Sequence, residues 1–416
     1  MQKSLAHNVI NIVINGLRFT LALVFVFSGF VKAVDPMGVV YKMSDYAEAF
    51  GWVVHPALLW IGACGLIILE YVMGVALFFG FYRRFYLTMT ILFLGMMTPL
   101  TLMLAITNPI SDCGCFGDAV VLTNWQTFGK NALLLIMAIV ALIYNRRIRR
   151  IVSERTQWLV FIYALVSVVV FMEYNLRHLP GFDFRPYSIG TNIINDMTIP
   201  DDAPQSEYET LFVLEKDGEQ HTFTFDNYPD STWTFVRRES RLISEGYTPP
   251  IKDFHLLSLE GEDLTLDVLE EPGYTFLMVA RNLERTNEGM LDIINDLYDY
   301  AKVNGYPFYM LTSSNEDVID RWTEHTGSAY PYLQADEILL KTMLRANLGL
   351  IILHDAVVTG KWSARDLPRD EQLGAAIEHN RALTISSHTL TVRRATMIFG
   401  MFLPLLLLSV IYRKRE

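Results

Sequence analysis

The stretch Ser111-Asp112-Cys113-Gly114-Cys115-Phe116-Gly117-Asp118 lies between two long apolar segments, residues 85–107 and 125–144. It holds two of the three cysteines in the 416-residue chain. A short polar connection between membrane-length segments predicts a helical hairpin with both cysteines at a membrane surface. Two interpretations of the loop stay open: thiol–disulfide chemistry at Cys113 and Cys115, or a structural turn in which the cysteines are small, buryable side chains.

Outward from this loop, several segments are long and apolar enough to cross a bilayer, which takes about 20 residues. They are residues 9–31, 57–80, 85–107, 125–144, 157–175 and 394–412. No small-x-small cleavage site follows the first segment, so we interpret it as a retained helix rather than a signal peptide. The sequence therefore predicts a multi-pass protein of the cell (inner) membrane that has the lipid bilayer as a partner.

Basic residues gather in alternate connections between these segments. The set comprises Lys3, Arg83, Arg84, Arg146, Arg147, Arg149, Arg150, Arg155, Arg413, Lys414 and Arg415. Because Lys and Arg are enriched in cytoplasmic loops, this pattern predicts that both termini are cytoplasmic. The cysteine loop and residues 180–392 are then extracytoplasmic. Arg393 and Arg394, just before the last span, depart from the pattern.

Charge divides the chain into two parts. Residues 180–392 hold 36 acidic and 16 basic residues, a net charge of −20, whereas the rest of the chain carries +9. The acidic part would repel phosphate, so we expect no nucleic-acid binding. It contains no cysteine, so it cannot perform thiol exchange itself. The histidines form no Cys/His cluster, and no structural zinc site is expected.

Ionisable residues inside the spans are costly and therefore informative. Arg18 and Glu70 both lie roughly 14 Å from the cytoplasmic side when depth is counted along the helices. Equal depth and opposite charge predict an Arg18–Glu70 pair, either structural or proton-handling. The first helix is expected to end at the outer surface at Asp35-Pro36, and Lys32 near this end is interpreted as reaching the membrane surface. Cys64 shares the outer leaflet with the loop and is either a packing residue or a third participating thiol.

Three motifs, in this order, resemble those of DoxX/MauE-type membrane proteins over about residues 9–145. They are the stretch from Arg18 to Lys32 with Ser28-Gly29 and the following Asp35-Pro36, Glu70 with Gly74, Gly80 and the turn Arg83-Arg84, and the loop from Asp112 to Asp118. The resemblance implies a four-helix bundle. For MauE-type proteins it also implies a role in maturing disulfide-containing extracytoplasmic proteins, akin to quinone-linked disulfide-forming membrane proteins.

Residues 180–248 follow the fifth span and are predicted to form a linker with a β-hairpin. The apolar runs Leu211–Leu214 and Thr222–Phe225 flank Asp217-Gly218, which is a strong hairpin-turn signal. The stretch Trp233–Ile243 is compatible with a strand or a short helix. Thr248-Pro249-Pro250 separates this region from the next.

Residues 249–390 alternate predicted strands and helices. The strands are Tyr274–Ala280, Phe308–Thr312 and a closing hairpin, Leu348–Leu353 with Val357–Trp362; the helices are Glu288–Val303, Asn315–His325 (capped by Ser314) and Glu337–Arg345. Such alternation predicts an α/β sheet covered by helices. The order, with Lys252-Asp253-Phe254 at its entry, resembles the thioredoxin-like fold of TlpA-type extracytoplasmic proteins.

Two departures from that fold bear on chemistry. Arg281–Arg285 stands where a Cys-x-x-Cys would be expected, and Asn347-Leu348-Gly349 replaces the usual cis-proline. Without cysteines this part lacks a nucleophile. It is therefore predicted to be non-catalytic and to bind or position a partner.

The predicted organisation has a membrane bundle of four helices plus two further transmembrane helices, joined to an α/β part. The proposed boundaries are 1–145, 146–179, 180–248, 249–390 and 391–416. One hypothesis is a membrane thiol–disulfide oxidoreductase in which Cys113 and Cys115 cycle for extracytoplasmic protein clients, with a quinone as a candidate electron acceptor. Asp112 and Asp118 would oppose thiolate formation there. The alternative is a non-enzymatic assembly or envelope-homeostasis factor whose loop is structural.

Overall fold

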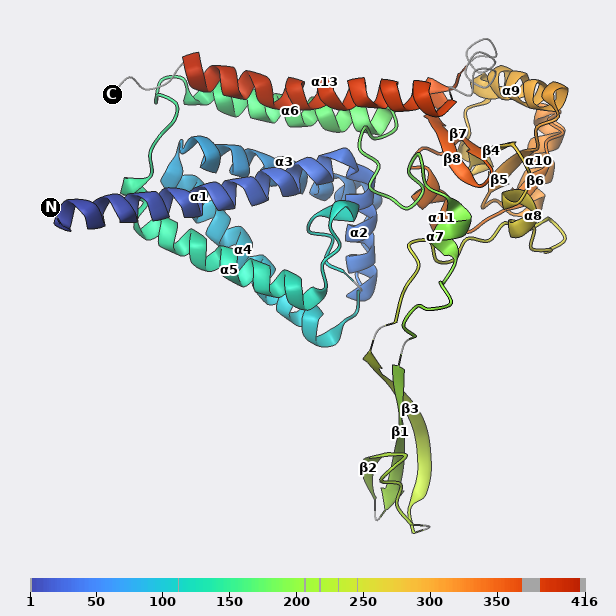
Figure 1. Cartoon of the computed structure of the whole chain (residues 1–416), viewed down its shortest axis with the longest axis horizontal. Helices are drawn as coiled ribbons and strands as arrows, with labels where there is room; N and C mark the ends of the chain where they lie inside the picture. Colours follow the sequence, from blue (N-terminus) through green and yellow to red (C-terminus); the bar gives the residue numbers. More distant parts are fainter. Residues whose placement is uncertain are drawn as a thin grey trace.

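The computed structural model describes residues 2–110, 112–205, 207–216, 218–230, 232–244, 246–368 and 382–411. Ser111, the turn residue Asp217 and the basic tail from Arg413 to Arg415 lie outside the described residues. Figure 1 shows a group of long helices, an α/β unit at one end of this group, and a separate small sheet that projects away from both.

Six of the described helices are long and apolar enough to span a membrane, as the sequence predicted. They are α1 (Gln2–Val34), α3 (Pro56–Phe79), α4 (Arg83–Thr107), α5 (Asn124–Ile143), α6 (Gln157–Arg177) and α13 (Ala382–Ile411). All six contribute to one hydrophobic core. In Figure 1, α6 and α13 lie side by side along the four-helix group of α1, α3, α4 and α5.

The α1 and α3 backbones approach each other closely because of small residues. A Cβ atom at Gly29 would lie 2.6 Å from the backbone nitrogen of Tyr71, which is closer than real Cβ contacts allow. Small residues permit such close packing of helices in membranes. This contact sets the register of the two helices, in which Arg18 of α1 lies beside Gly80 at the end of α3.

A short helix that the sequence did not predict follows α1. The expected end of the first helix at Asp35-Pro36 is confirmed, because α1 stops at Val34. The same two residues start α2 (Pro36–Ala49): Pro36 occupies its first turn, and the Asp35 side chain accepts a hydrogen bond from the Gly38 amide. Proline is well suited to a first helical position behind such a cap. Helix α2 therefore lies across the end of the bundle (Figure 1).

The projecting sheet contains three antiparallel strands in the order β2-β1-β3. Strand β1 (Glu207–Lys216) pairs with β2 (Glu219–Thr224), which confirms the predicted hairpin. The ambiguous stretch after Trp233 is a strand, β3 (Thr234–Ser244), on the other side of β1.

The α/β unit, residues 249–368, contains a five-stranded sheet in the order β6-β5-β4-β7-β8. Its strands are β4 (Tyr274–Ala280), β5 (Phe308–Thr312), β6 (Tyr332–Gln334), β7 (Leu348–His354) and β8 (Val357–Ser363). Strands β4, β5 and β6 are parallel, whereas β7 runs antiparallel to both β4 and β8. Alternating strands and helices are thus confirmed, with the predicted hairpin as β7 and β8.

Helices cover both faces of this sheet. One face packs against α7 (Ile193–Met197), α8 (Thr265–Leu269) and α11 (Glu337–Met343), and the other against α9 (Leu291–Asn304) and α10 (Glu316–Thr326). The predicted cap of α10 was wrong by one residue: Asn315, not Ser314, accepts from the Val318 amide. The unit is tied to the chain leaving α6 by a buried cluster in which Asp183 binds both Arg185 and Lys361.

Candidate functional site

The two loop cysteines face each other. Their sulfur atoms lie 3.2 Å apart, and both are half-buried free thiols. Gly114 between them has φ +67°, and a Cβ atom there would lie 2.9 Å from Cγ of Lys42. A residue with a side chain would be strained in this backbone conformation and would also clash. The Cys-Gly-Cys spacing is therefore what brings the thiols together.

Three buried side chains anchor the loop to the bundle. The Lys32 ammonium contacts Glu70 at 2.7 Å and donates to the Ser28 hydroxyl at 2.9 Å. The Ser28 hydroxyl lies within donating distance of Glu70 Oε2, at 2.8 Å, and of the Cys115 carbonyl oxygen, at 2.7 Å. Because each member is at least 93% buried, a charge left alone here would be costly.

The predicted Arg18–Glu70 pair is wrong. The Arg18 guanidinium donates to the Arg149 carbonyl at 2.9 Å, toward the end of the bundle where α1 begins. Glu70 lies toward the opposite end and pairs with Lys32, whose predicted role as a side chain reaching the membrane surface is also wrong, because it is buried. Counting depth separately along each helix could not reveal the register that the Gly29 contact imposes.

Helix α2 holds the other side of the loop. Lys42 forms an ion pair with Asp112 at 3.0 Å, and Asp112 in turn accepts a hydrogen bond from the Gly114 amide at 2.8 Å. The Tyr46 hydroxyl donates to the Cys113 carbonyl oxygen at 3.1 Å. The two cysteines thus have different anchors, with Cys113 held from α2 and Cys115 held from α1.

Electrostatics distinguish the two thiols. The hydrogen bond between their sulfur atoms raises the pKa of Cys113 and lowers the pKa of Cys115 to about 6, against the effect of burial. The ammonium groups of Lys130 and Lys32 lower the pKa of Cys115 further. Lys130 Nζ lies 4.3 Å from the centroid of the neighbouring Phe116 ring, a cation–π contact. The lysine ammonium groups thus favour the thiolate form of Cys115.

Residues 10–144, which include most of α1 and the cysteine loop, match the family model described as Methylamine utilisation protein MauE. These residues form a MauE-like membrane region. Residues 208–245, the projecting sheet, match a model described as Domain of unknown function (DUF8463). No curated protein and no solved structure matches the chain.

The cysteine pair of the MauE-like region lines a cavity of about 910 Å³. Its lining includes the charged side chains of Lys32, Glu70 and Lys130 and the apolar side chains of Phe93, Met96, Met97 and Leu100. The lining residues include neither Cys64 nor Arg18; Cys64 packs instead against the bundle core. Of the three accessory residues named from the sequence, the structure thus brings only Glu70 to the cysteines.

The α/β unit contributes to the same cavity through α11 and Arg345. The Arg345 guanidinium binds Asp35, the cap of α2, at 2.8 Å and lies 3.6 Å from Asp118. Together with the Lys42–Asp112 pair, this contact gives each of the two loop acids a cationic partner. The opposition to thiolate formation that was expected from Asp112 and Asp118 is thereby reduced.

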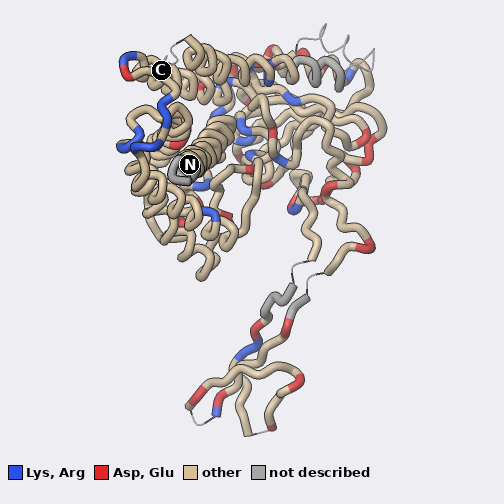
Figure 2. The backbone as a smooth tube through the Cα atoms, turned by 60° about the vertical axis from the view of Figure 1, so that its left-hand side comes forward, with Lys and Arg blue, Asp and Glu red and all other residues tan. Residues whose placement is uncertain are grey.

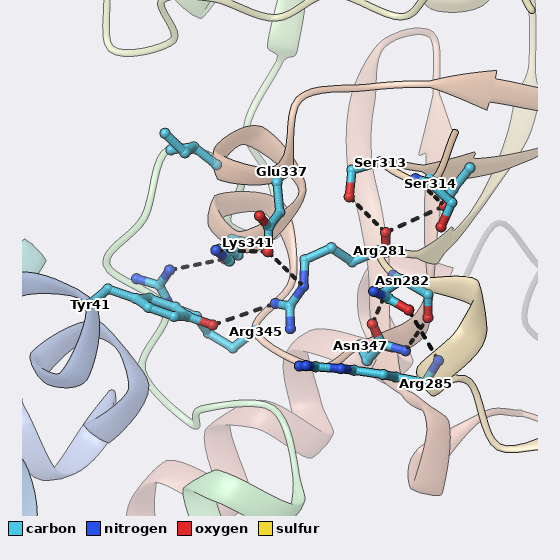
Figure 3. Close-up of polar contacts among 12 residues, drawn as sticks. Tyr41, Arg281, Asn282, Arg285, Ser313, Ser314, Glu337, Lys341, Arg345 and Asn347 are labelled. Atoms are coloured by element: carbon cyan, nitrogen blue, oxygen red, sulfur yellow. Dashed lines mark hydrogen bonds and ion pairs between the residues drawn. The ribbon is translucent and has the colours of Figure 1, made fainter. Parts of the chain in front are cut away.

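Figure 3 shows the end of the α/β sheet that faces α2. Arg281, directly after β4, donates to the Tyr41 hydroxyl at 3.5 Å and lies near Glu337 of α11. Beside it, Asn282 and Asn347 exchange two hydrogen bonds of 2.9 Å. This end of the sheet, where a Cys-x-x-Cys would be expected, therefore carries a polar contact surface instead.

Sequence reasoning overlooked most of the side chains that surround the thiols. Ser28 was noted only as part of a motif, and Lys42, Tyr46 and Lys130 were not considered. One signal was available: Ser28 and Lys32 are four residues apart and so share a helix face. For Lys42 and Tyr46 no such signal existed, because their helix, α2, was itself not predicted.

Proposed function

We propose that this protein is a membrane thiol–disulfide oxidoreductase whose redox pair is Cys113 and Cys115. The observation that carries the proposal is the meeting of two free thiols at 3.2 Å in a cavity, with unequal pKa values. Unequal thiols suit exchange, because the sulfur with the lower pKa is the better leaving group. The likeness of residues 10–144 to MauE proteins supports a maturation role in the membrane.

The exchange has a defined direction at the two sulfurs. A client thiolate attacks Cys113 of the oxidised pair, the Cys113–Cys115 bond breaks, and Cys115 leaves as the thiolate that Lys130 and Lys32 stabilise. The second client thiol then attacks the client sulfur of this mixed disulfide and releases Cys113. The client thus loses two electrons and two protons, and the cysteine pair gains them.

Reoxidation of the pair requires a two-electron acceptor, for which we propose a membrane quinone. The cavity suits such a molecule, because its lining combines the apolar side chains of Phe93, Met97 and Leu100 with the polar side chains of Lys130 and Asn131. A quinone held beside Lys130 and Asn131 would accept the two electrons and two protons that Cys113 and Cys115 give up when their disulfide forms. Lys130 holds positive charge beside Cys115, which favours the thiolate that reacts in this step.

The proposed orientation places the cysteine loop and residues 180–392 outside the cytoplasm. The loop lies at the end of α1 that carries Ser28 and Lys32, whereas Arg147 and Arg149 lie at the other end of α1, near Asn11 and Arg18. Figure 2 shows a cluster of Lys and Arg near the start of α1, and Asp and Glu prominent on the α/β unit and the projecting sheet. This distribution supports cytoplasmic termini in an inner membrane.

The α/β unit is proposed to be a thioredoxin-like, partner-binding module without catalytic thiols. Supporting features are the parallel β4–β5 pair joined through α9 and the antiparallel β7–β8 hairpin beside β4. Its clients would be extracytoplasmic proteins that carry cysteines. The likeness of the bundle to DoxX proteins belongs to the same proposal.

A second candidate is a non-enzymatic assembly factor. The observation that favours it is the buried Ser28–Lys32–Glu70 cluster, which would hold the loop whether or not the thiols react. In that case Cys113 and Cys115 are replaceable by serine, and the α/β unit alone carries the function.

Trapping of clients tests the proposed function. A full-length Cys115→Ala variant, expressed in a deletion strain, should form reductant-sensitive adducts with extracytoplasmic proteins through Cys113. In this variant Cys113 can still attack a client disulfide, and no Cys115 thiol is left to complete the exchange. The controls are Cys113→Ser/Cys115→Ser, which should form none, and Cys64→Ser, which should behave as wild type. Full restoration of growth and client oxidation by the double-serine protein would overturn the proposal in favour of the assembly factor.

A further inference from the structure

Helix α2 contacts both the α/β unit and the cysteine loop. It carries Tyr41, which faces the α/β unit, and Lys42 and Tyr46, which face the loop. Lys42 and Tyr46 are four residues apart and so share one face of the helix. Tyr41, one residue before Lys42, points from a neighbouring face.

The α/β unit holds the N-terminal half of α2 at two places. Lys341 Nζ lies 5.0 Å, and the Arg345 guanidinium carbon 5.4 Å, from the centroid of the Tyr41 ring. Arg345 also binds Asp35, whose side chain caps α2. Figure 3 shows Tyr41 reaching from α2 into this group of cations. Cations at these distances over the ring face are attracted to it, so both contacts hold Tyr41 against the α/β unit.

At the loop, α2 holds only one of the two cysteines directly. Tyr46 binds the Cys113 carbonyl, and Lys42 binds Asp112, the residue before it. The Cys115 carbonyl is bound by Ser28, which belongs to α1 and not to α2. A displacement of α2 would therefore move Cys113 relative to Cys115.

We propose that the α/β unit positions Cys113 through α2, with Tyr41 as the positioning residue that connects them. Docking of the unit on Tyr41 and Asp35 holds α2 where Tyr46 and Lys42 keep Cys113 against Cys115. Loss of docking releases α2 and exposes Cys113, whereas Cys115 stays bound to α1. The inference rests on the proposed function, because it assigns a control over the same cysteine pair. It also gives the cysteine-free α/β unit a task inside the molecule.

The test measures how fast each cysteine of the full-length protein in membranes reacts with a limiting amount of a water-soluble maleimide. A Cys64→Ser background removes the third thiol, and peptide mass spectrometry distinguishes Cys113 from Cys115. Tyr41→Ala should raise the ratio of Cys113 to Cys115 labelling by roughly three- to tenfold, as expected for the loss of a cation–π contact. Tyr41→Phe keeps the ring under both cations and should give a ratio close to that of the wild type.

A second variant approaches the same contact from the other side. Arg345→Gln removes the contact with Tyr41 and also the ion pair with Asp35, so it should raise the labelling ratio at least as much as Tyr41→Ala does. The double variant should add little to Arg345→Gln, since both changes release the same docking of the unit on α2. Arg321→Gln is the matched control, because Arg321 lies in the same unit but pairs with Glu284 at the surface.

Three outcomes would overturn the inference. An unchanged ratio in both variants would show that α2 does not transmit docking. An equal rise at both cysteines would indicate general loosening, and failure of both variants to accumulate would indicate a purely structural contact. Client trapping by Cys115→Ala is measured separately, so its absence alongside a changed labelling ratio would remove the proposed function and leave the positioning role in place.

Discussion

The end of α4 and the end of β4 both carry short polar turns, but they differ in chemistry. After α4, two thiols face each other at 3.2 Å beside the cations Lys32 and Lys130. After β4, Asn282 and Asn347 bind each other and Arg281 reaches Tyr41 of the membrane part. Under the proposed function, the turn after α4 would carry the reactive thiols, whereas the turn after β4 carries a polar contact with the membrane part. The comparison thus separates the proposed reactive groups from the groups that join the two parts of the chain.

The largest expected effect comes from replacing both loop cysteines by serine. Cys113→Ser/Cys115→Ser should reduce oxidation of a dithiol peptide by quinone-supplied membranes to background, because no nucleophile remains. Asn282→Ala/Asn347→Ala, the matched change at the other turn, should leave at least half of that oxidation. Equal losses of peptide oxidation in both double variants would show that the two turns do not differ in function.

A large effect on stability is expected at the buried pair of Lys32 and Glu70. Lys32→Met alone should destabilise the protein by about 3–5 kcal/mol, because it strands a buried carboxylate. Lys32→Met/Glu70→Leu should recover much of this loss, because both members of the pair are removed. Arg18→Leu/Glu70→Leu should remain destabilised, because it leaves the buried Lys32 without its partner. Thermal aggregation midpoints in detergent provide the measurement, and rescue by the Arg18 combination would contradict the observed pairing.

A smaller effect is expected on the titration of Cys115. Lys130→Met removes a cation that lowers the pKa of this thiol, so the pH midpoint of its alkylation should rise by about one pH unit. Alkylation at pH 7 should slow, and the difference should disappear at alkaline pH, where the thiol is ionised in both proteins. Lys130→Arg keeps the charge and serves as control; an unchanged midpoint in Lys130→Met would exclude this role of Lys130.

The smallest effect concerns the glycine between the thiols. Gly114→Ala places a side chain at φ +67° and against Lys42, at a cost of about 1–2 kcal/mol from the backbone conformation alone. We expect slower formation of the Cys113–Cys115 disulfide with little change in the amount of protein, as measured by mobility shift after labelling. Gly16→Ala, in open space on α1, is the control. Wild-type disulfide formation in Gly114→Ala would show that the turn tolerates other geometry.

Much of the fold could be predicted because its signals are local. Apolar length predicted the six membrane helices, and Asp217-Gly218 between apolar runs predicted the β1–β2 pair. The alternation from Tyr274 onward predicted the α/β sheet, because short connections leave few other arrangements. Helix α2 escaped prediction because Pro36 was treated as an end, although proline behind a capping Asp35 also begins helices.

The candidate site was only partly predictable. Cys113 and Cys115 were predicted because they are two of only three cysteines in the chain and lie in a polar loop between two apolar segments. Their environment depends on contacts across helices: the register of α1 on α3 joins Glu70 to Lys32, and the position of α2 brings Tyr46 to Cys113. Such registers are set by close backbone contacts such as Gly29 on Tyr71. Sequence distance along each helix does not contain that information.

The paired helices α6 and α13 have a consequence for the motion of the α/β unit. The unit lies in the chain between α6 and α13, which run side by side. Arg394, near the start of the membrane-spanning part of α13, donates to the carbonyl of Gly181, which follows α6. Both ends of the α/β unit are thus connected to membrane-spanning helices at neighbouring points. A tether at each end keeps a detached unit at a high effective concentration near its docking surface. Re-docking is then an intramolecular event that does not depend on how many copies of the protein the membrane holds.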